Sequence, residues 1–408
     1  MIVRDEEKIL PRCLKGVQGV ADEFIVLDTG SKDNTVAIAK DFGAKVFHFE
    51  WRDNFAAARN ESLKYATGDW ILQIDADEEL PNSSEGPLRH AIGNPWRLVY
   101  VIKCDDGPRV SQRFGWICRL FRHHPSLRYS RPYHESVWPS VDSVVKQEPG
   151  WQTHYEPSIV IRHHGYAPSA LAKKYQRGVD IMKGYLKRRP EDSYIWGKLG
   201  AAYYGQGNYD EATRCLNKAL EINPALPEAN YTLGVMLQEQ EELESAIPYY
   251  KRAIAGDSLL CEARANLGAI YVKTGMLDDA ILALKAALAT NPELALAHSN
   301  LGLAYISKGI FDAGMAALRK AIALDPNLSY PHMNLAVAYT KRGMLDDALL
   351  EYERALSIDP DYAKAHYNLA IAYVKRGDHA SAIEHCDRAL ALGAKIHPQL
   401  LALLEPYR

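Results

Sequence analysis

The N-terminal half of the chain is organised around one stretch, Trp70-Ile71-Leu72-Gln73-Ile74-Asp75-Ala76-Asp77-Glu78-Glu79. It is an apolar run, too short for a helix, that is followed at once by a cluster of carboxylates. Such a run predicts a buried strand, and in an open α/β sheet ligands bind beyond the carboxyl ends of the strands. Asp75 and Asp77 would be hard oxygen ligands there, suited to Mg²⁺ or Mn²⁺. The same acids would also fit a solvated strand end.

Three more apolar runs lie upstream and alternate with helical patterns. The predicted strands are 1–3, 24–27, 45–49 and 70–74, and the predicted helices are 6–17, 35–42 and 55–66. The first of these strands resembles the end of a longer strand whose beginning is missing. This alternation predicts a Rossmann-like, mostly parallel sheet with helices on both faces.

Acidic residues follow three of these strands, namely Asp5, Asp28, and the pair Asp75 and Asp77. Because parallel strands bring their carboxyl ends to one edge of a sheet, we expect these side chains to share a crevice. Carboxylates gathered in one crevice repel one another unless a cation or a hydrogen-bonding ligand lies among them. Their convergence, more than any single acid, therefore indicates a binding site.

Four motifs in this order resemble the family 2 glycosyltransferases, in the bacterial branch that carries tetratricopeptide repeats behind the catalytic domain. The motifs are Met1–Glu7, Val26–Thr35, Trp51 with Asn54–Asn60, and Ile74–Glu79. The resemblance covers about residues 1–165. It implies an α/β domain of the GT-A fold, a nucleotide-sugar donor, Mn²⁺ or Mg²⁺ as cofactor, and inversion at the anomeric carbon.

The resemblance also implies roles for single residues. Asp5 and Asp28 resemble the acids that contact the uracil and ribose of the donor, and Arg59 resembles a basic residue near the diphosphate. Asp75 would reach the ribose, directly or through the metal, and Asp77 would bind the metal. The chemistry agrees, because carboxylates accept hydrogen bonds from ribose hydroxyls and an arginine fork suits phosphate. The alternative for Arg59 is a surface arginine on a helix.

Residues 80–165 would hold the acceptor side of the cleft. Apolar patterns in this segment predict strands at 98–102, 116–121 and 159–166. An inverting transfer needs a carboxylate that takes the proton of the acceptor, and Glu135, in a His-Glu pair that resembles this branch, is the candidate base. The alternatives are Asp105, Asp106 and Glu79, and a plain loop-surface role for Glu135 also stays open.

One histidine is a candidate metal ligand. His164 precedes Gly-Tyr, as in this branch, and a neutral imidazole suits Mn²⁺. It would be a third metal ligand or a contact to the pyrophosphate, and the alternative is an ordinary packed or exposed histidine. His163 lies on the opposite face of the predicted strand and is the weaker candidate.

From about residue 167 the chain is helical and repetitive. We expect a connecting helix over 166–192 and then, over 193–408, six repeats of period 34 with a capping helix at 398–404. The proline that ends a second helix recurs at this spacing or twice it, at Pro190, Pro224, Pro292, Pro326 and Pro360, and Ser258 takes the place of the missing one. Small residues that would let two helices approach closely recur as Gly200, Gly234, Gly268, Gly302, Ala336 and Ala370, and as Ala212, Ala246, Ala280, Gly314, Ala348 and Ala382. The pattern resembles tetratricopeptide repeats, which stack into a superhelix with a concave groove.

Two polar residue types recur within these repeats. Asn266, Asn300, Asn334 and Asn368 share one position that we expect on the concave side. Such a ladder can bind the backbone of an extended peptide, as in the eukaryotic O-linked GlcNAc transferases that this half resembles, although asparagine is also usual there in repeats without a peptide. The histidines at 298, 332 and 366 cannot share a metal ion, because packed helices lie about 8–10 Å apart and a bond from histidine to a metal is about 2 Å long.

Composition narrows the class of protein. The 408 residues carry a net charge of −3, which argues against a nucleic-acid binder. The six cysteines are scattered, which favours reduced thiols in a cytoplasm over a disulfide framework. No signal-peptide layout and no apolar run long enough for a membrane span is present. We therefore expect a cytoplasmic protein.

These observations predict a metal-dependent inverting glycosyltransferase, a hexosyl- or N-acetylhexosaminyl-transferase. It would move a sugar from a nucleotide-sugar, by resemblance a UDP-sugar, to a protein or peptide acceptor held by the repeats. One alternative is a glycosyltransferase that acts on a lipid-linked or lipopolysaccharide-type saccharide, with the repeats as a scaffold that recruits partners. The other is a non-enzymatic repeat scaffold with a vestigial transferase domain, against which the intact acids of all four motifs argue.

Overall fold

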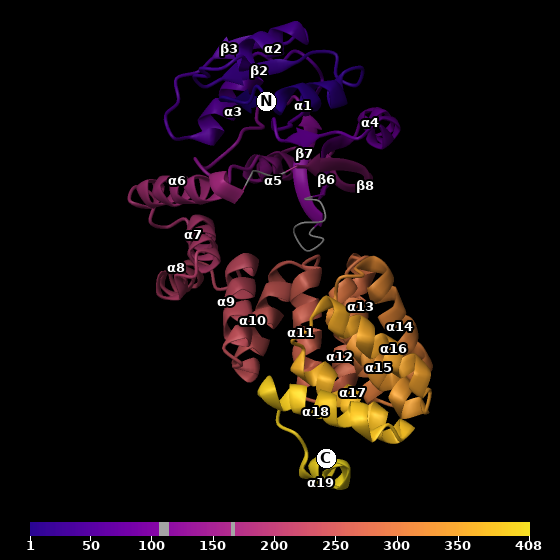
Figure 1. Ribbon diagram of the computed structural model, residues 1–408. Helices are drawn as coiled ribbons and strands as arrows, with labels where there is room; N and C mark the ends of the chain where they lie inside the picture. Colours follow the sequence, from indigo (N-terminus) through magenta and orange to yellow (C-terminus); the bar gives the residue numbers. More distant parts are fainter. Residues whose placement is uncertain (106–113, 165–167) are drawn as a thin grey trace. The chain divides into compact units, whose positions relative to one another are not determined.

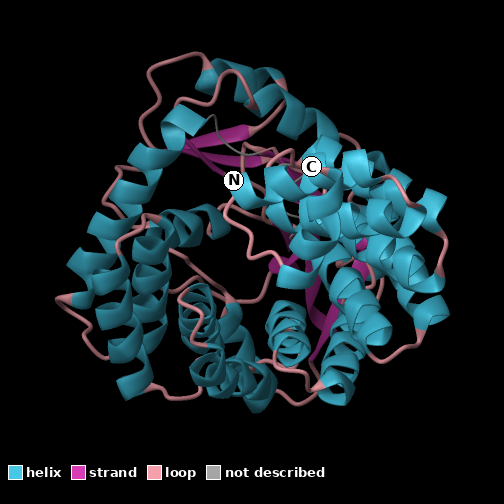
Figure 2. Ribbon diagram, turned by 60° about the horizontal axis from the view of Figure 1, so that its bottom comes forward, coloured by secondary structure: helices cyan, strands magenta, loops and turns pink. Residues whose placement is uncertain are grey.

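The computed structural model describes residues 1–105, 114–164 and 168–408 (Figure 1). The chain divides into two compact units, Met1–Cys215 and Leu216–Arg408. Every described strand lies in the first unit, and the second unit is built of helices (Figure 2). The predicted order of an α/β domain followed by helical repeats is confirmed.

Three parallel strands form the first sheet, in the order β1–β2–β3. They are β1 (Ile2–Val3), β2 (Ile25–Asp28) and β3 (Lys45–His48), and the helices that follow them are α1 (Leu10–Val17), α2 (Thr35–Asp41) and α3 (Phe55–Leu63). The register sets Val3 beside Asp28, and Asp28 beside His48. The carboxyl end of β2 therefore lies between the ends of the other two strands.

The prediction of a fourth parallel strand before Asp75 is wrong. β4 (Trp70–Leu72) lies at the edge of a second, mixed sheet of order β4–β7–β6–β8–β5, where it pairs antiparallel with β7. β1 has only two residues, and both pair with β2. A cavity of about 170 Å³ has Met1, Ile25 and Trp70 in its lining.

The second sheet has helices on both faces. Its remaining strands are β5 (Glu78–Glu79), β6 (Arg97–Asp105), β7 (Phe114–Arg122) and β8 (Gln152–His163). Tyr100 and Ile102 of β6 pack with α1 and with α4 (Glu85–Ile92), whereas Val99 packs with α3 and with α5 (Trp138–Gln147). The predicted layers are therefore present, although the strands divide into two sheets.

Two helices are shorter than their patterns predict. α1 begins at Leu10 rather than residue 6, because Pro11 is tolerated in the first turn of a helix but breaks its interior. α3 ends at Leu63 rather than residue 66. Its start is fixed by Asn54, whose side chain accepts a hydrogen bond of 2.9 Å from the backbone N–H of Ala57.

Six helix pairs follow the connecting helix α6 (Pro168–Leu186). The first helices are α7 (Ser193–Gly205), α9 (Pro227–Glu239), α11 (Cys261–Lys273), α13 (Ala295–Ser307), α15 (Ser329–Arg342) and α17 (Ala363–Arg376). The second helices are α8 (Tyr209–Ile222), α10 (Leu243–Gly256), α12 (Leu277–Thr290), α14 (Phe311–Leu324), α16 (Leu345–Ile358) and α18 (His379–Ala391). Successive first helices start 34 residues apart, and α19 (Pro398–Leu404) follows them as expected.

The small residues bring the two helices of a repeat into contact. A Cβ atom on Gly268 would lie 2.6 Å from Cγ of Leu284, and one on Gly302 would lie 2.6 Å from Cγ of Leu318. Both distances are shorter than a Cβ atom tolerates, so a larger residue would force the leucine side chain or its helix to move. The close packing that the spacing predicts is therefore present.

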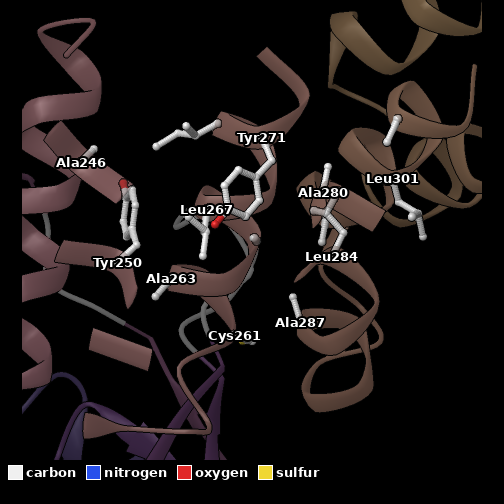
Figure 3. Close-up of a cluster of buried hydrophobic side chains, with 14 of the residues drawn as sticks. Ala246, Tyr250, Cys261, Ala263, Leu267, Tyr271, Ala280, Leu284, Ala287 and Leu301 are labelled. Atoms are coloured by element: carbon white, nitrogen blue, oxygen red, sulfur yellow. The ribbon is translucent and has the colours of Figure 1, made fainter. Parts of the chain in front are cut away.

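Within the second unit, neighbouring repeats share clusters of buried side chains. Figure 3 shows part of one cluster, where Leu267 and Tyr271 of α11 lie between Tyr250 of α10 and Leu284 of α12. No helix pair could bury these side chains by itself, so the stack supplies the core.

The recurring histidines take part in the packing of the repeats. Nε2 of His298 lies 2.9 Å from the carbonyl oxygen of Pro292, and Nε2 of His366 lies 3.1 Å from that of Pro360. Asn230, two repeats before His298 in the same column, donates to the carbonyl of Pro224 at 2.9 Å. Each bond ties a first helix to the turn before it.

The first helices of the second unit stack directly on one another. α11, α13, α15 and α17 each pack against the next in that series, whereas the second helices contact each other less. A stack that is closer on one side curves toward that side, so the first helices line its inner surface. The four recurring asparagines lie on these helices.

Gly302→Ala is expected to lower the stability of the repeats by about 1–3 kcal/mol. The added methyl group overlaps Leu318 and the backbone oxygen of Gly314, and this overpacking outweighs the higher helix propensity of alanine. Ala316→Val, at an exposed position of α14, is the control and should cost about 0.5 kcal/mol or less. Urea unfolding followed by circular dichroism measures both, and equal midpoints for Gly302→Ala and the parent would contradict the close packing.

Candidate active site

The loops after β1 and β2 are locked together by acidic side chains. Oδ1 of Asp5 accepts a hydrogen bond of 2.6 Å from the backbone N–H of Lys32, and the N–H of Asp5 donates to Oγ of Ser31 at 3.0 Å. Glu7 accepts bonds of 3.1 Å from both the backbone N–H and the side-chain amide of Asn34. Asp5 therefore lies against the loop that begins at Asp28, as the sequence predicts for two strand ends at one edge.

Asp28 is a buried anion held by backbone N–H groups. Its carboxylate accepts bonds from the N–H groups of Ser31 at 3.0 Å and Gly30 at 3.2 Å, and it lies 3.2 Å from Nδ1 of His48. Burial acts to raise the pKa of Asp28, but the hydrogen bonds from Ser31, Gly30 and His48 outweigh it and hold the pKa below the ordinary value of 3.8. Gly30 has φ 105°, which only glycine adopts without strain.

Asp75 belongs to a network of buried ions. Its oxygens accept bonds of 3.0 and 3.2 Å from Nη2 of Arg59, and Oδ2 accepts a further bond of 2.9 Å from Nη2 of Arg119. Arg119 also donates to Oε1 of Glu78 at 2.7 Å. Burial acts to raise the pKa of Asp75, but the charges of Arg119 and Arg59 outweigh it and hold the pKa far below its usual range. Asp75 is thus balanced by cations of the protein itself.

Arg59 joins Asp75 to the candidate base. Its Nε donates to Oε1 of Glu135 at 2.6 Å. Its side chain is 7% exposed, so the interpretation as a surface arginine is wrong. Nη1 is buried and has no hydrogen-bond partner among the described residues. The guanidinium therefore keeps donor capacity for one more acceptor, and its role toward a diphosphate stays a prediction.

Asp77 and Glu79 each face one histidine from the end of β8. Nε2 of His163 lies 3.1 Å from Oδ2 of Asp77, and Nε2 of His164 lies 2.7 Å from Oε2 of Glu79. The pairing of Asp77 with His164 in one metal site stays a prediction. In the structure it is His163, the weaker candidate by strand alternation, that pairs with Asp77.

The donor atoms fit a cation that is shared with a substrate. Within the described ranges, no three side chains of His, Cys, Asp or Glu lie together as a closed metal site would need. Mg²⁺ usually takes one or two carboxylates and completes its shell with phosphate oxygens and water, and Mn²⁺ accepts imidazole beside carboxylate. Asp77 with one of the two histidines supplies such a partial site.

Ala76 holds the acidic segment 75–79 against the first sheet. It packs in the core cluster that contains Val3 of β1 and Val26 of β2. The acids after β4 thus remain beside the strands that carry Asp5 and Asp28, although β4 itself belongs to the other sheet.

The other candidate bases are dispersed. Asp105 ends β6 and lies 4.0 Å from Nε of Arg162, Glu79 pairs with His164, and Asp106 lies outside the described residues. Glu135 is the candidate that the structure joins to Arg59 and, through it, to Asp75.

The four asparagines differ in their surroundings. The side-chain amide of Asn266 donates to the hydroxyl of Tyr250 at 3.3 Å, and that of Asn368 lies 3.7 Å from Sδ of Met333. Asn334 is 7% exposed, and Asn300 is half-buried. Their role in binding a peptide stays a prediction.

Two partners of the predicted residues, Arg119 and His48, were missed in the sequence, and His163 was named there only as the weaker candidate. Arg119 interrupts an apolar strand, and a cation inside a buried strand needs a counterion, so that signal was available. His48 ends β3 at the same edge as Asp28, and strand position alone could have pointed to it.

Comparison with models of protein families assigns both halves of the chain. Residues 1–140 match the model of glycosyl transferase family 2. Models of tetratricopeptide repeats match at 193–226, 227–255, 268–309, 295–328, 337–377 and 363–393. The chain joins a family 2 glycosyltransferase domain to tetratricopeptide repeats.

Similar curated proteins cover parts of the chain. A TPR repeat-containing protein of Synechococcus elongatus is 40% identical over 260 residues, which are 62% of this chain and 64% of that protein. The glycosyltransferase SunS of Bacillus subtilis is 28% identical over 54% of this chain and 52% of its own length. An uncharacterized glycosyltransferase of Rickettsia felis is 35% identical over 30% of this chain and 46% of its own length. The chain thus spans less than two thirds of each of these relatives.

Among solved structures, that of MamA is 28% identical and covers 39% of this chain and 94% of the MamA chain, with a TM-score of 0.34. Of the helices that the structure describes, none combines the length and the hydropathy that crossing a bilayer requires.

Asp28→Asn is expected to cost stability at neutral pH and to cost less as the solution becomes acidic. Because the folded state holds the pKa of Asp28 below 3.8, the ionised carboxylate stabilises the fold above that pH, and this contribution is lost as the pH falls through the folded pKa. Thermal unfolding of the parent and the variant over a series of pH values measures the difference. Asp142→Asn, at an exposed position of α5, is the control, and a difference for Asp28→Asn that persists undiminished in acid would contradict the assignment.

Proposed function

We propose that the chain is an inverting glycosyltransferase that moves a sugar from a UDP-sugar to a protein or peptide acceptor bound by the repeats, with Mn²⁺ or Mg²⁺ as cofactor. The observation that carries this proposal is the family 2 match over the residues whose strand ends hold the acids. The name of the similar SunS protein, a glycosyltransferase, is consistent with it. The proposed transferred group is a hexosyl or N-acetylhexosaminyl group. A cytoplasmic location is part of the proposal and is supported by six free cysteines.

Donor binding is assigned to the first sheet. A nucleoside offers N–H and O–H donors, and carboxylates fixed in place accept such bonds well. Asp28 is fixed by the backbone of residues 30–31, and Asp5 by the backbone of Lys32. In this proposal Asp5 and Asp28 bind the base and ribose, and Asp75, oriented by two arginines, reaches the ribose directly or through the metal.

The leaving diphosphate needs positive charge. A divalent cation held by Asp77 together with His163 or His164 would supply most of it when bound. Arg59 adds charge of its own, because Nη1 is buried and has no partner in the described part of the chain.

Glu135 is the proposed base. As the acceptor atom forms its bond to the anomeric carbon and the bond from that carbon to the diphosphate breaks, Glu135 takes the proton of the acceptor. Its side chain is 14% exposed, and its carboxylate is oriented by the bond of 2.6 Å from Arg59. Because this bond restricts the orientation of the carboxylate, the base is held in position for proton transfer.

The repeats are the proposed acceptor site. First helices line the inner surface of the stack, and asparagine recurs on them. Binding of an acceptor far from the reacting atoms can contribute to its positioning at the active site.

Asp77→Ala is expected to lower the rate of UDP-sugar hydrolysis or transfer in the presence of Mn²⁺ by about 100-fold, the loss that follows when one electrostatic contact to a developing charge is removed. Asp142→Ala, which removes an exposed acid of α5, should keep the rate of the parent. Radiolabelled sugar released or transferred is the measurement, with circular dichroism to confirm folding. An unchanged rate for Asp77→Ala would reject the metal role.

Asn300→Ala combined with Asn368→Ala is expected to raise the KM for a protein acceptor by about 30-fold, because each peptide hydrogen bond contributes about 1 kcal/mol. Hydrolysis of the donor should be unchanged. Acceptors are found first by mass spectrometry of proteins co-expressed with the chain. Asn217→Ala, at an exposed position of α8, is the control. A KM that does not change would favour an acceptor other than a peptide.

A further inference from the structure

The loop that carries Glu135 has an unusual backbone. Ser130 and Ser136 exchange backbone hydrogen bonds of 3.0 and 3.3 Å across its neck. Within the loop, Arg131 has φ 71° and His134 has φ 52°, values that residues with a Cβ rarely adopt. Such conformations persist only where the surroundings hold them in place. Other parts of the chain must therefore hold this loop in its conformation.

One support is the connecting helix α6. Tyr133 lies so close to Gly178 that a Cβ on this glycine would be 2.6 Å from Cζ of the tyrosine ring. The neighbouring Arg177 lies over the rings of Trp51 and Phe55, at 4.7 and 5.9 Å from their centroids. Phe55 in turn contacts Tyr133 edge-on, with centroids 5.8 Å apart. α6 thus touches both the loop and the start of α3, the helix that carries Arg59.

The other support is the start of α7, the first helix of the first repeat. Asp192 caps this helix, since its Oδ1 accepts a bond of 3.2 Å from the N–H of Ile195. Its Oδ2 accepts bonds of 3.0 Å from Nε of Arg131 and 3.1 Å from the hydroxyl of Tyr185. The guanidinium of Arg131 also lies 4.3 Å from the ring centroid of Tyr194. The cap of the first repeat is therefore bonded to the loop.

We infer that α6 and the start of α7 belong to the catalytic domain and position Glu135 through Tyr133 and Arg131. The inference rests on the proposed function, in which Glu135 takes the acceptor's proton. It extends the catalytic domain beyond the family match, which ends at residue 140, and the compact first unit, which continues to Cys215, agrees with it. Tyr133, Arg131, Gly178 and Asp192 are then positioning residues.

A pair of glycine substitutions in one helix tests this in the full chain. Gly178→Ala drives a methyl group into Tyr133, whereas Gly184→Ala meets no atom within 4 Å. Gly178→Ala is expected to lower kcat by about 10- to 100-fold, the cost of a misplaced catalytic group, with the KM for the UDP-sugar within about 2-fold. Gly184→Ala should match the parent. Gly178→Ala combined with Tyr133→Leu, which removes the overlapping ring, should recover part of kcat.

A second pair tests the cap without depending on turnover. Asp192→Asn keeps a capping oxygen but removes the charge that Arg131 meets. Asp378→Asn does the same to the cap of α18, where the partner is Ser381. Amide hydrogen exchange is the measurement. Asp192→Asn is expected to raise exchange in residues 129–137 at least about 10-fold, the change that a lost contact of about 1.4 kcal/mol produces, and Asp378→Asn should leave these residues unchanged.

The outcomes separate the two proposals. An inactive parent chain whose loop still loosens in Asp192→Asn would reject the proposed function and keep the structural link. An active parent whose kcat survives in a folded Gly178→Ala variant would overturn the inference and keep the proposed function. Equal losses in Gly178→Ala and Gly184→Ala would also overturn it, as would unchanged exchange in Asp192→Asn.

Discussion

The first unit depends on the ion pairs that the buried guanidinium of Arg59 makes. This group donates to Asp75, which follows β4, and to Glu135, which lies 76 residues further along than Arg59 itself. Loss of both carboxylates would leave a buried cation uncompensated, at a cost of several kcal/mol. Arg59 therefore fixes the distance between the acidic strand end and the loop before α5, and α3 must stay in place to hold it.

Asp75, Asp77 and Asp28 have partners of different chemistry. Asp75 faces two arginines, which cannot give up their protons to make room for a metal. Asp77, one residue beyond Ala76, faces His163 instead, and an imidazole can itself be a metal ligand. Asp28 is held by backbone N–H groups, which bind any anion-like acceptor but no cation. Similar carboxylates near these strand ends thus have different partners in the fold.

The repeats meet the catalytic domain at a side chain with two roles. Asp192 both caps α7 and binds Arg131 of the loop, so the first repeat cannot shift without strain in that loop. In the later repeats the same columns of small residues pack the two helices of each repeat together, and each repeat also contacts its neighbours. The first repeat helix, α7, therefore belongs to the repeats by its period and is bonded to the first domain through its cap, Asp192.

Local patterns in the sequence were enough for the elements, the repeats and the acids at strand ends. Apolar periodicity and a 34-residue period are properties of short segments, which fold the same way in many contexts. The sequence did not reveal that β4 joins the antiparallel sheet, that Arg119 binds Asp75 across 44 positions, or that His163 meets Asp77 across 86. Such pairs depend on how distant strands align, which a one-residue change of register alters completely, so only the tertiary structure decides them.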